Sequence, residues 1–160
     1  MAEGLPEPVE RVSDFLRESG AEARIHEFAD GTHTAQAAAD AVGCELGQIV
    51  KSLVFVCNEK PVVALVPGDR RGDPTKVARA VDAGAARVAS AQEVEDATGF
   101  APGAVPPFPL SNVDVVLMDR ALYRHQLVWA GAGSARHVVG MAPAELARLA
   151  RARPLDVSAD

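Results

Sequence analysis

Two apolar runs that follow one another along the chain constrain the fold more than any other feature. Residues 52–58 are SLVFVCN, residues 61–67 are PVVALVP, and the short sequence NEKP joins them. Each run is rich in β-branched side chains and has the length of a buried strand rather than of a core helix. We therefore expect the two runs to form neighbouring, largely buried strands.

Helical and extended patterns alternate irregularly along the rest of the chain. Apolar residues at three- and four-residue spacing predict a helix over residues 7–19, and Thr34 can cap a second, alanine-rich helix. Asp73 and Pro74 begin a third, which we expect to reach about Gly84. Two more helices are predicted over residues 90–99 and from residue 143, with short strands at residues 23–28, 86–89, 113–119, 127–133 and 137–141.

Some of these strands follow each other directly, while others are separated by helices. This order predicts the α+β (mixed α/β) class, with a mixed, mostly antiparallel sheet surrounded by helices. The 160 residues suit one domain, since roughly 100–200 residues is the usual size. We expect that domain to span residues 1–160, with its core at about 22–150 and a frayed tail at 154–160.

The composition excludes several classes of protein. No apolar run approaches the roughly 20 residues that cross a bilayer, and the acidic start MAEGLPEPVERVSDF lacks the features of a signal peptide. We therefore expect a cytoplasmic protein without membrane contact. The net charge of −6 argues against a broad grip on nucleic-acid phosphates, and DNA is not an expected partner. A local positive patch could still form where four cations cluster along one segment: Arg70, Arg71, Lys76 and Arg79.

Familiar catalytic and metal-binding signatures are absent from the sequence. It has no GxSxG, HExxH or phosphate-binding GxxxxGK[ST] motif, and its four histidines lie in separate segments. Cys44 and Cys57 lack the spacing of zinc ligands and are expected to be apolar side chains. We predict no metal and no cofactor, and the residues by themselves indicate no side-chain nucleophile.

Two features nevertheless suggest a site. Lys51 lies at the start of the first apolar run, where its charge could stabilise an anion or could simply reach water along the sheet edge. The loop FAPGAVPPF combines a glycine with stiffening prolines, so that its backbone could approach a ligand. Such loops are also ordinary connectors, and the glycines of AGAGSARH could equally mark a tight strand end.

Four motifs, in this order and at this spacing, resemble the YbaK/ProX family: GQIVKSLVF, PGDRR, TGFAPGAVPP and VWAGAG. These proteins are freestanding relatives of the editing domain of bacterial prolyl-tRNA synthetases. The resemblance covers roughly residues 22–150. It implies the fold of that editing domain and an aminoacyl-tRNA deacylase that acts in trans, using water assisted by the ribose hydroxyl of the substrate.

The resemblance also implies roles for individual residues. Lys51 matches a lysine that contacts the terminal adenosine or the substrate, with Ser52 beside it. The GxxxP loop that holds the aminoacyl carbonyl corresponds to Gly103, Ala104, Val105, Pro106 and Pro107. Other positions that match the amino-acid pocket are Phe28, Thr34, Gly131 and His137. Phe28 could instead belong to the core, Thr34 could be only a helix cap, and His137 could be an ordinary strand residue.

The sequence departs from the Cys-tRNA(Pro) deacylases at two points. Thr34 stands where an aromatic residue is expected, and AGAGSAR replaces a basic, glycine-rich SGGxRG. An alanyl, seryl, threonyl or other small aminoacyl ester is therefore as suitable a substrate as a cysteinyl ester. The expected partners are the acceptor end of aminoacyl-tRNA and, as an open alternative, a synthetase, with the protein as a monomer or weak homodimer. The alternatives in function are a non-catalytic binding module and a hydrolase of another small activated ester or thioester.

Overall fold

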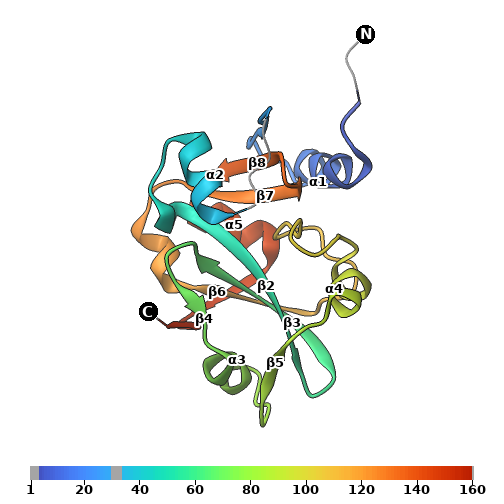
Figure 1. The fold of residues 1–160 in the computed structure, drawn as a ribbon, viewed down its shortest axis with the longest axis vertical. Helices are drawn as coiled ribbons and strands as arrows, with labels where there is room; N and C mark the ends of the chain where they lie inside the picture. Colours follow the sequence, from blue (N-terminus) through green and yellow to red (C-terminus); the bar gives the residue numbers. More distant parts are fainter. Residues whose placement is uncertain (1–3, 30–33, 160) are drawn as a thin grey trace.

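A computed structural model describes residues 4–29 and 34–159. Its main sheet has eight strands in the order β1-β8-β7-β2-β3-β6-β9, with β5 paired to β2, and β4 and β10 form a separate pair (Figure 1). The strands are β1 (Ile25–Glu27), β2 (Ile49–Cys57), β3 (Lys60–Pro67), β4 (Arg71–Gly72), β5 (Ala86–Val88), β6 (Val115–Asp119), β7 (Val128–Ser134), β8 (His137–Met141), β9 (Ala152–Leu155) and β10 (Ser158–Ala159). The helices are α1 (Glu7–Glu18), α2 (Ala35–Val42), α3 (Pro74–Ala80), α4 (Ala91–Thr98) and α5 (Pro143–Ala150), with 3-10 turns η1 (Leu46–Gln48) and η2 (Arg120–Arg124).

The two apolar runs form the central hairpin. Strands β2 and β3 pair antiparallel from Val50 opposite Pro67 to Cys57 opposite Lys60. Asn58 and Glu59 make the turn with φ of 50° and 65°, and positive φ at both central residues is typical of a tight two-residue hairpin. The predicted pairing of the two runs is confirmed.

After Lys60, strand β3 is apolar throughout because both of its faces are buried. Val63 and Leu65 pack on one face in a cluster with residues of α1 and α5, while Val62, Ala64 and Val66 pack on the other with Val77 of α3. Successive side chains of a strand point to opposite faces, so a strand covered on both sides needs an unbroken apolar run. This arrangement explains why the run shows no polar alternation.

Parallel and antiparallel pairs occur in the same sheet. Strand β2 runs parallel to β7, β3 to β6, and β6 to β9, whereas the β1–β8, β7–β8, β2–β3 and β2–β5 pairs are antiparallel. Helices pack around this sheet. The predicted mixed fold class, in which antiparallel pairs slightly outnumber parallel ones, is confirmed.

Two predicted boundaries were wrong. Helix α3 ends at Ala80 rather than near Gly84, and Asp82 two residues later adopts a left-handed φ of 56°. The tail after Pro154, expected to fray, is ordered: Val157 is fully buried, and β10 pairs with β4. The amide of Val157 donates a 3.0 Å hydrogen bond to the buried carboxylate of Asp119. No local sequence pattern predicts this contact.

Candidate functional site

A cavity opens where two parallel strands separate. Strands β2 and β7 are paired only at Ile49–Trp129 and Val50–Ala130, and β2 next pairs on this side with β5, from Phe55 onward. Residues 49–53 of β2 and 129–131 of β7 line this cavity, together with residues 103–105, the start of α2, and residues 134, 135, 137 and 138 around the β7–β8 turn. The cavity holds about 270 Å³, a little below the range typical of drug-sized ligands, and therefore suits a small chemical group.

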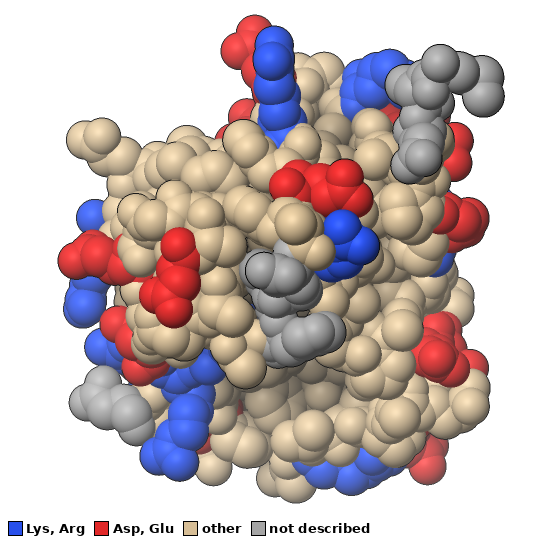
Figure 2. Space-filling model, turned by 45° about the horizontal axis from the view of Figure 1, so that its top comes forward, with Lys and Arg blue, Asp and Glu red and all other residues tan. Residues whose placement is uncertain are grey.

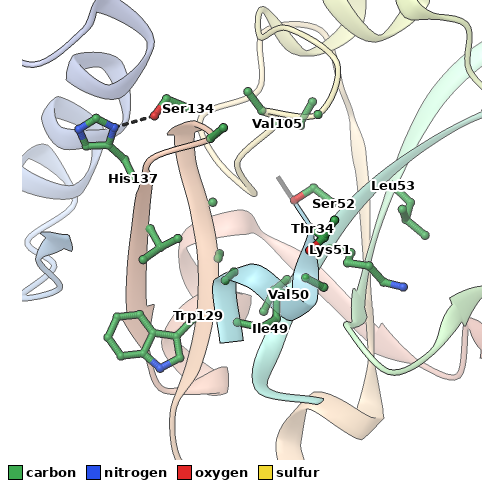
Figure 3. Close-up of a pocket in the computed structure, with 18 residues that line it drawn as sticks. Thr34, Ile49, Val50, Lys51, Ser52, Leu53, Val105, Trp129, Ser134 and His137 are labelled. Atoms are coloured by element: carbon green, nitrogen blue, oxygen red, sulfur yellow. Dashed lines mark hydrogen bonds between the residues drawn. The ribbon is translucent and has the colours of Figure 1, made fainter. Parts of the chain in front are cut away.

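Lys51 lies at the point where β2 leaves β7. Lys51 lines the cavity, and its Nζ donates a hydrogen bond to the backbone carbonyl of Arg70. In Figure 3 the amine points away from Ser134 and His137. Burial lowers the pKa of the Lys51 amine, and the nearby carboxylate of Asp69 offsets part of this effect. The structure thus holds a partly desolvated cation beside the cavity, where its charge is less screened than in water.

The loop between α4 and β6 supplies another part of the lining. Gly103, Ala104 and Val105 line the cavity, and Gly103 has a left-handed φ of 83°, which a side chain would strain. The amide of Ala104 is already used within the loop, since it donates a 3.0 Å hydrogen bond to Ala101. The loop is therefore a preformed wall whose backbone conformation depends on glycine.

A histidine and a serine lie at the far end of the cavity from the Lys51 amine (Figure 3). His137 Nδ1 and Ser134 Oγ are 2.6 Å apart, and both residues line the cavity. The side chain of His137 is only 3% exposed, and its Nε2 lies 3.4 Å from a carboxylate oxygen of Glu27. A buried imidazole with a hydroxyl on one side and a carboxylate on the other can accept and return a proton.

Thr34 has two roles in the geometry. Its Oγ1 accepts a 3.0 Å hydrogen bond from the amide of Ala37, so the predicted helix cap is confirmed. The same residue lines the cavity from the N-terminus of α2. Thr34 is therefore both a helix cap and a cavity residue, because the capping hydrogen bond holds it at the edge of the cavity.

The structure brings most of the predicted residues to one cavity. Those that line it are Thr34, Lys51, Ser52, Gly103, Ala104, Val105, Gly131 and His137. Among the described residues three predicted ones do not. Phe28 is half-buried and its carbonyl accepts a 3.0 Å hydrogen bond from Arg136, Pro107 lines a separate cavity beside Phe108, and Pro106 is buried without lining either.

Sequence reasoning missed Ser134 and Glu27. Ser134 lies three residues before His137 and is its register partner in the β7–β8 pairing. A serine and a histidine at that spacing in AGAGSARH were the available signal. Glu27 faces His137 because the two residues are partners in the antiparallel pairing of β1 and β8. Such cross-strand pairing between segments 110 positions apart gives no local signal.

The charges around the molecule are mixed. The face shown in Figure 2 carries Lys or Arg and Asp or Glu side chains scattered among uncharged surface, and the chain has a net charge of −6. Within the described residues no group of three or more His, Cys, Asp or Glu side chains could hold a metal ion. Likewise, no helix in the described ranges has the length and apolarity to span a membrane.

Comparisons with known proteins agree on one family. The model of the aminoacyl-tRNA editing domain matches residues 29–149. A crystal structure of a candidate trans-editing enzyme for prolyl-tRNA synthetase superposes with a TM-score of 0.91 at 37% identity, covering 98% of this chain and 100% of that one. The fold and the domain family are thus matched over nearly the whole chain.

Similar relatives include freestanding proteins and parts of larger ones. YwhH of Bacillus subtilis, itself uncharacterized, is 34% identical over 76% of this chain and 78% of its own length. EbsC of Enterococcus faecalis, named as a candidate Cys-tRNA(Pro)/Cys-tRNA(Cys) deacylase, is 27% identical over 69% of this chain and 68% of its own. Proline–tRNA ligase of Limosilactobacillus fermentum is 32% identical over 66% of this chain, which spans only 20% of that enzyme.

Proposed function

Because this chain belongs to the aminoacyl-tRNA editing domain family, we propose that it is a trans-editing deacylase that hydrolyses the ester of a mischarged tRNA. The observation that carries the proposal is the cavity between β2 and β7, where Lys51 and the Gly103 loop lie on neighbouring walls. A cation and a rigid backbone loop beside one small cavity suit an ester whose carbonyl gains negative charge during hydrolysis.

The proposed substrate carries a small amino acid, such as alanine, cysteine, serine or threonine, on tRNA(Pro). The cavity volume of about 270 Å³ favours a small side chain. The relation to a candidate trans-editing enzyme for prolyl-tRNA synthetase supports the choice of tRNA. A need for such an enzyme follows from chemistry, since a synthetase pocket rejects amino acids of similar or smaller size by only about 10–200-fold.

In the proposed mechanism a water molecule attacks the ester carbonyl, oriented by the free hydroxyl of the terminal ribose. Lys51 contacts the terminal adenosine or the developing negative charge, for which its amine has to leave the carbonyl of Arg70. The Gly103 loop positions the aminoacyl carbonyl, and Thr34, Ser52, Gly131 and His137 shape the space for the amino acid. Such an ester is already activated, so orientation and charge stabilisation supply most of the catalysis.

The proposed contact with tRNA is confined to the acceptor end. A protein with a net charge of −6 has few cations for a long phosphate backbone. Recruitment by a synthetase would supply the remaining affinity, and the proposed place of action is the cytoplasm, where tRNA is charged. We propose a monomer or weak homodimer as the working form.

Two other functions give different results in one experiment. The experiment incubates the protein with tRNA(Pro) charged in turn with alanine, cysteine, serine, threonine and proline, and measures the remaining ester over time. A deacylase removes at least one small amino acid catalytically and spares prolyl-tRNA. A non-catalytic module binds the charged tRNA without turnover. For an enzyme that acts on another small ester, uncharged tRNA does not inhibit the hydrolysis of that ester. Absence of hydrolysis across the panel would rule out the proposed function.

A further inference from the structure

Three side chains form a continuous path from the surface to the cavity. Glu27 on β1, His137 on β8 and Ser134 on β7 are contributed by three adjacent strands. The side chain of Glu27 is 60% exposed and that of His137 is 3% exposed. Ser134 and His137 both line the cavity, so the path joins the bulk solvent to the proposed reaction site.

Among the described residues, the hydrogen bonds of Ser134 leave one position on its hydroxyl unused. Its Oγ accepts a 3.0 Å hydrogen bond from the amide of Arg136 and lies 2.6 Å from Nδ1 of His137. A serine hydroxyl has one donor and two acceptor positions. With two of these three occupied within the protein, the third remains for a molecule in the cavity.

The other imidazole nitrogen lacks a hydrogen-bond partner among the described residues. His137 Nε2 is buried and makes no hydrogen bond there, yet it lies 3.4 Å from Oε2 of Glu27. A carboxylate at this distance favours a proton on Nε2. Nδ1 of the neutral imidazole is then an acceptor, and the Ser134 hydroxyl donates to it.

A proton added to Nδ1 reverses the direction of this hydrogen bond. The imidazolium donates from Nδ1 to Ser134 Oγ, and the hydroxyl proton becomes free to point into the cavity. Oε2 of Glu27 lies 3.4 Å from Nε2 on the other side of the ring. The unused position on Ser134 thus changes from acceptor to donor whenever His137 gains a proton.

We propose that Ser134, His137 and Glu27 form a proton relay for the hydrolysis of the aminoacyl ester, an inference that rests on the proposed function. As water adds to the carbonyl carbon, the water gives a proton to Ser134 Oγ, which passes its own proton to His137 Nδ1. When the carbon–oxygen bond to the ribose breaks, Ser134 gives a proton to the leaving oxygen and recovers one from Nδ1. One water is consumed, and a free amino acid and a ribose hydroxyl are formed.

The relay must be distinguished from a purely structural hydrogen bond. Ser134 Oγ also accepts a hydrogen bond from the amide of Arg136 in the turn between β7 and β8, so Ser134→Ala alone could disturb the backbone. Ser134→Thr keeps the hydroxyl. His137→Asn can keep a hydrogen bond to Ser134 but cannot take up a proton at neutral pH. These two variants separate hydrogen bonding from proton transfer.

The kinetic test uses single-turnover deacylation of the panel ester that the wild-type protein hydrolyses fastest, with the variants at saturating concentration. Positioned acid–base groups contribute about 10²–10⁴-fold, so Ser134→Ala and His137→Asn are expected to lose about 100-fold or more, and Ser134→Thr to restore most of the rate. Glu27→Gln is expected to lose up to about fivefold, because an exposed charge contributes little. The matched control is Glu22→Gln, an exposed carboxylate outside the relay.

A spectroscopic readout tests the relay independently of turnover. Nitrogen NMR of the ¹⁵N-histidine-labelled protein reports which ring nitrogen carries the proton, and the His137→Asn spectrum assigns the signal among the four histidines. A neutral ring with its proton on Nε2 supports the relay, and a neutral ring with its proton on Nδ1 overturns it. Wild-type rates in both Ser134→Ala and His137→Asn also overturn it while leaving the deacylase function standing. Absence of hydrolysis by the wild type overturns both.

Discussion

Lys51 donates a hydrogen bond from its amine to the backbone carbonyl of Arg70. This contact joins the start of β2 to the turn that follows β3, beside Asp69. The amine is therefore held next to the cavity by a neutral acceptor, and among the described residues it forms no salt bridge. A cation held in this way remains available to an incoming anion, because a carbonyl competes for it less strongly than a carboxylate does.

Lys51→Ala is expected to lower the deacylation rate by about 100-fold or more, which is the typical cost of removing a group that stabilises developing charge. The fold should persist, because the side chain is only half-buried. Single-turnover kinetics and thermal unfolding measure the two effects. Lys60→Ala, at an exposed position of the β2–β3 hairpin, is the control and should retain the wild-type rate. A Lys51→Ala protein with wild-type activity would contradict the central role of Lys51.

Asp69→Asn is expected to lower the pKa of Lys51 further. Burial already lowers this pKa, and the Asp69 carboxylate opposes that effect. NMR of ¹³C-lysine-labelled protein follows the titration directly, since the chain has three lysines and Lys51→Ala assigns the signal. Asp114→Asn, a change at an exposed carboxylate, should leave the titration unchanged. An unchanged midpoint in Asp69→Asn would show that Asp69 does not act on the amine.

The same pKa shift fixes the sign of a stability effect. The folded protein releases the Lys51 proton at lower pH than the unfolded chain does. Between the two pKa values the unfolded chain binds more protons, so the free energy of unfolding rises with pH in that interval and this contribution is constant outside it. Urea unfolding across mildly alkaline pH should show a smaller rise in Lys51→Ala than in the wild-type protein.

Local sequence patterns predicted the elements that depend on local chemistry. The central hairpin follows from two apolar runs joined by a short turn, and the cap at Thr34 follows from its side-chain oxygen. Lys51 was found because a charge beside a buried strand is unusual. Each of these signals lies within fewer than about twenty residues of chain, where spacing determines which groups can meet.

Features that depend on distant segments gave no such signal. The cavity exists because β2 and β7 pair over two residues and then separate, and these strands are about 80 positions apart. Resemblance to a family, rather than periodicity, predicted that Gly103 and Gly131 belong to the same site. The pairing of Glu27 with His137 and the burial of Val157 likewise arise from tertiary packing, which overrides local preference.

Val157→Ala is expected to destabilise the protein by about 2 kcal/mol, from the loss of two buried carbon groups and the cavity that remains. Val157 is fully buried in the cluster with Val77 and Leu117. Val88 provides a matched control because its side chain is 71% exposed, and Val88→Ala should cost about 0.5 kcal/mol or less. Urea unfolding measures both, and equal costs would mean that the C-terminal segment adds nothing to the core.

Gly103→Ala is expected to reduce deacylation by about tenfold or more without a steric clash. A Cβ at this position would meet no atom within 4 Å, but the φ of 83° is left-handed, and holding alanine there costs about 1–2 kcal/mol. The loop can relieve this strain by moving the cavity wall, and small displacements at a reaction site are costly. Gly20 is the matched control, since it has a φ of 69° and equally open surroundings at the end of α1, and it does not line the cavity. Gly20→Ala should therefore show a similar loss of stability with an unchanged deacylation rate, and equal rates for the two variants would remove the Gly103 backbone from the proposed mechanism.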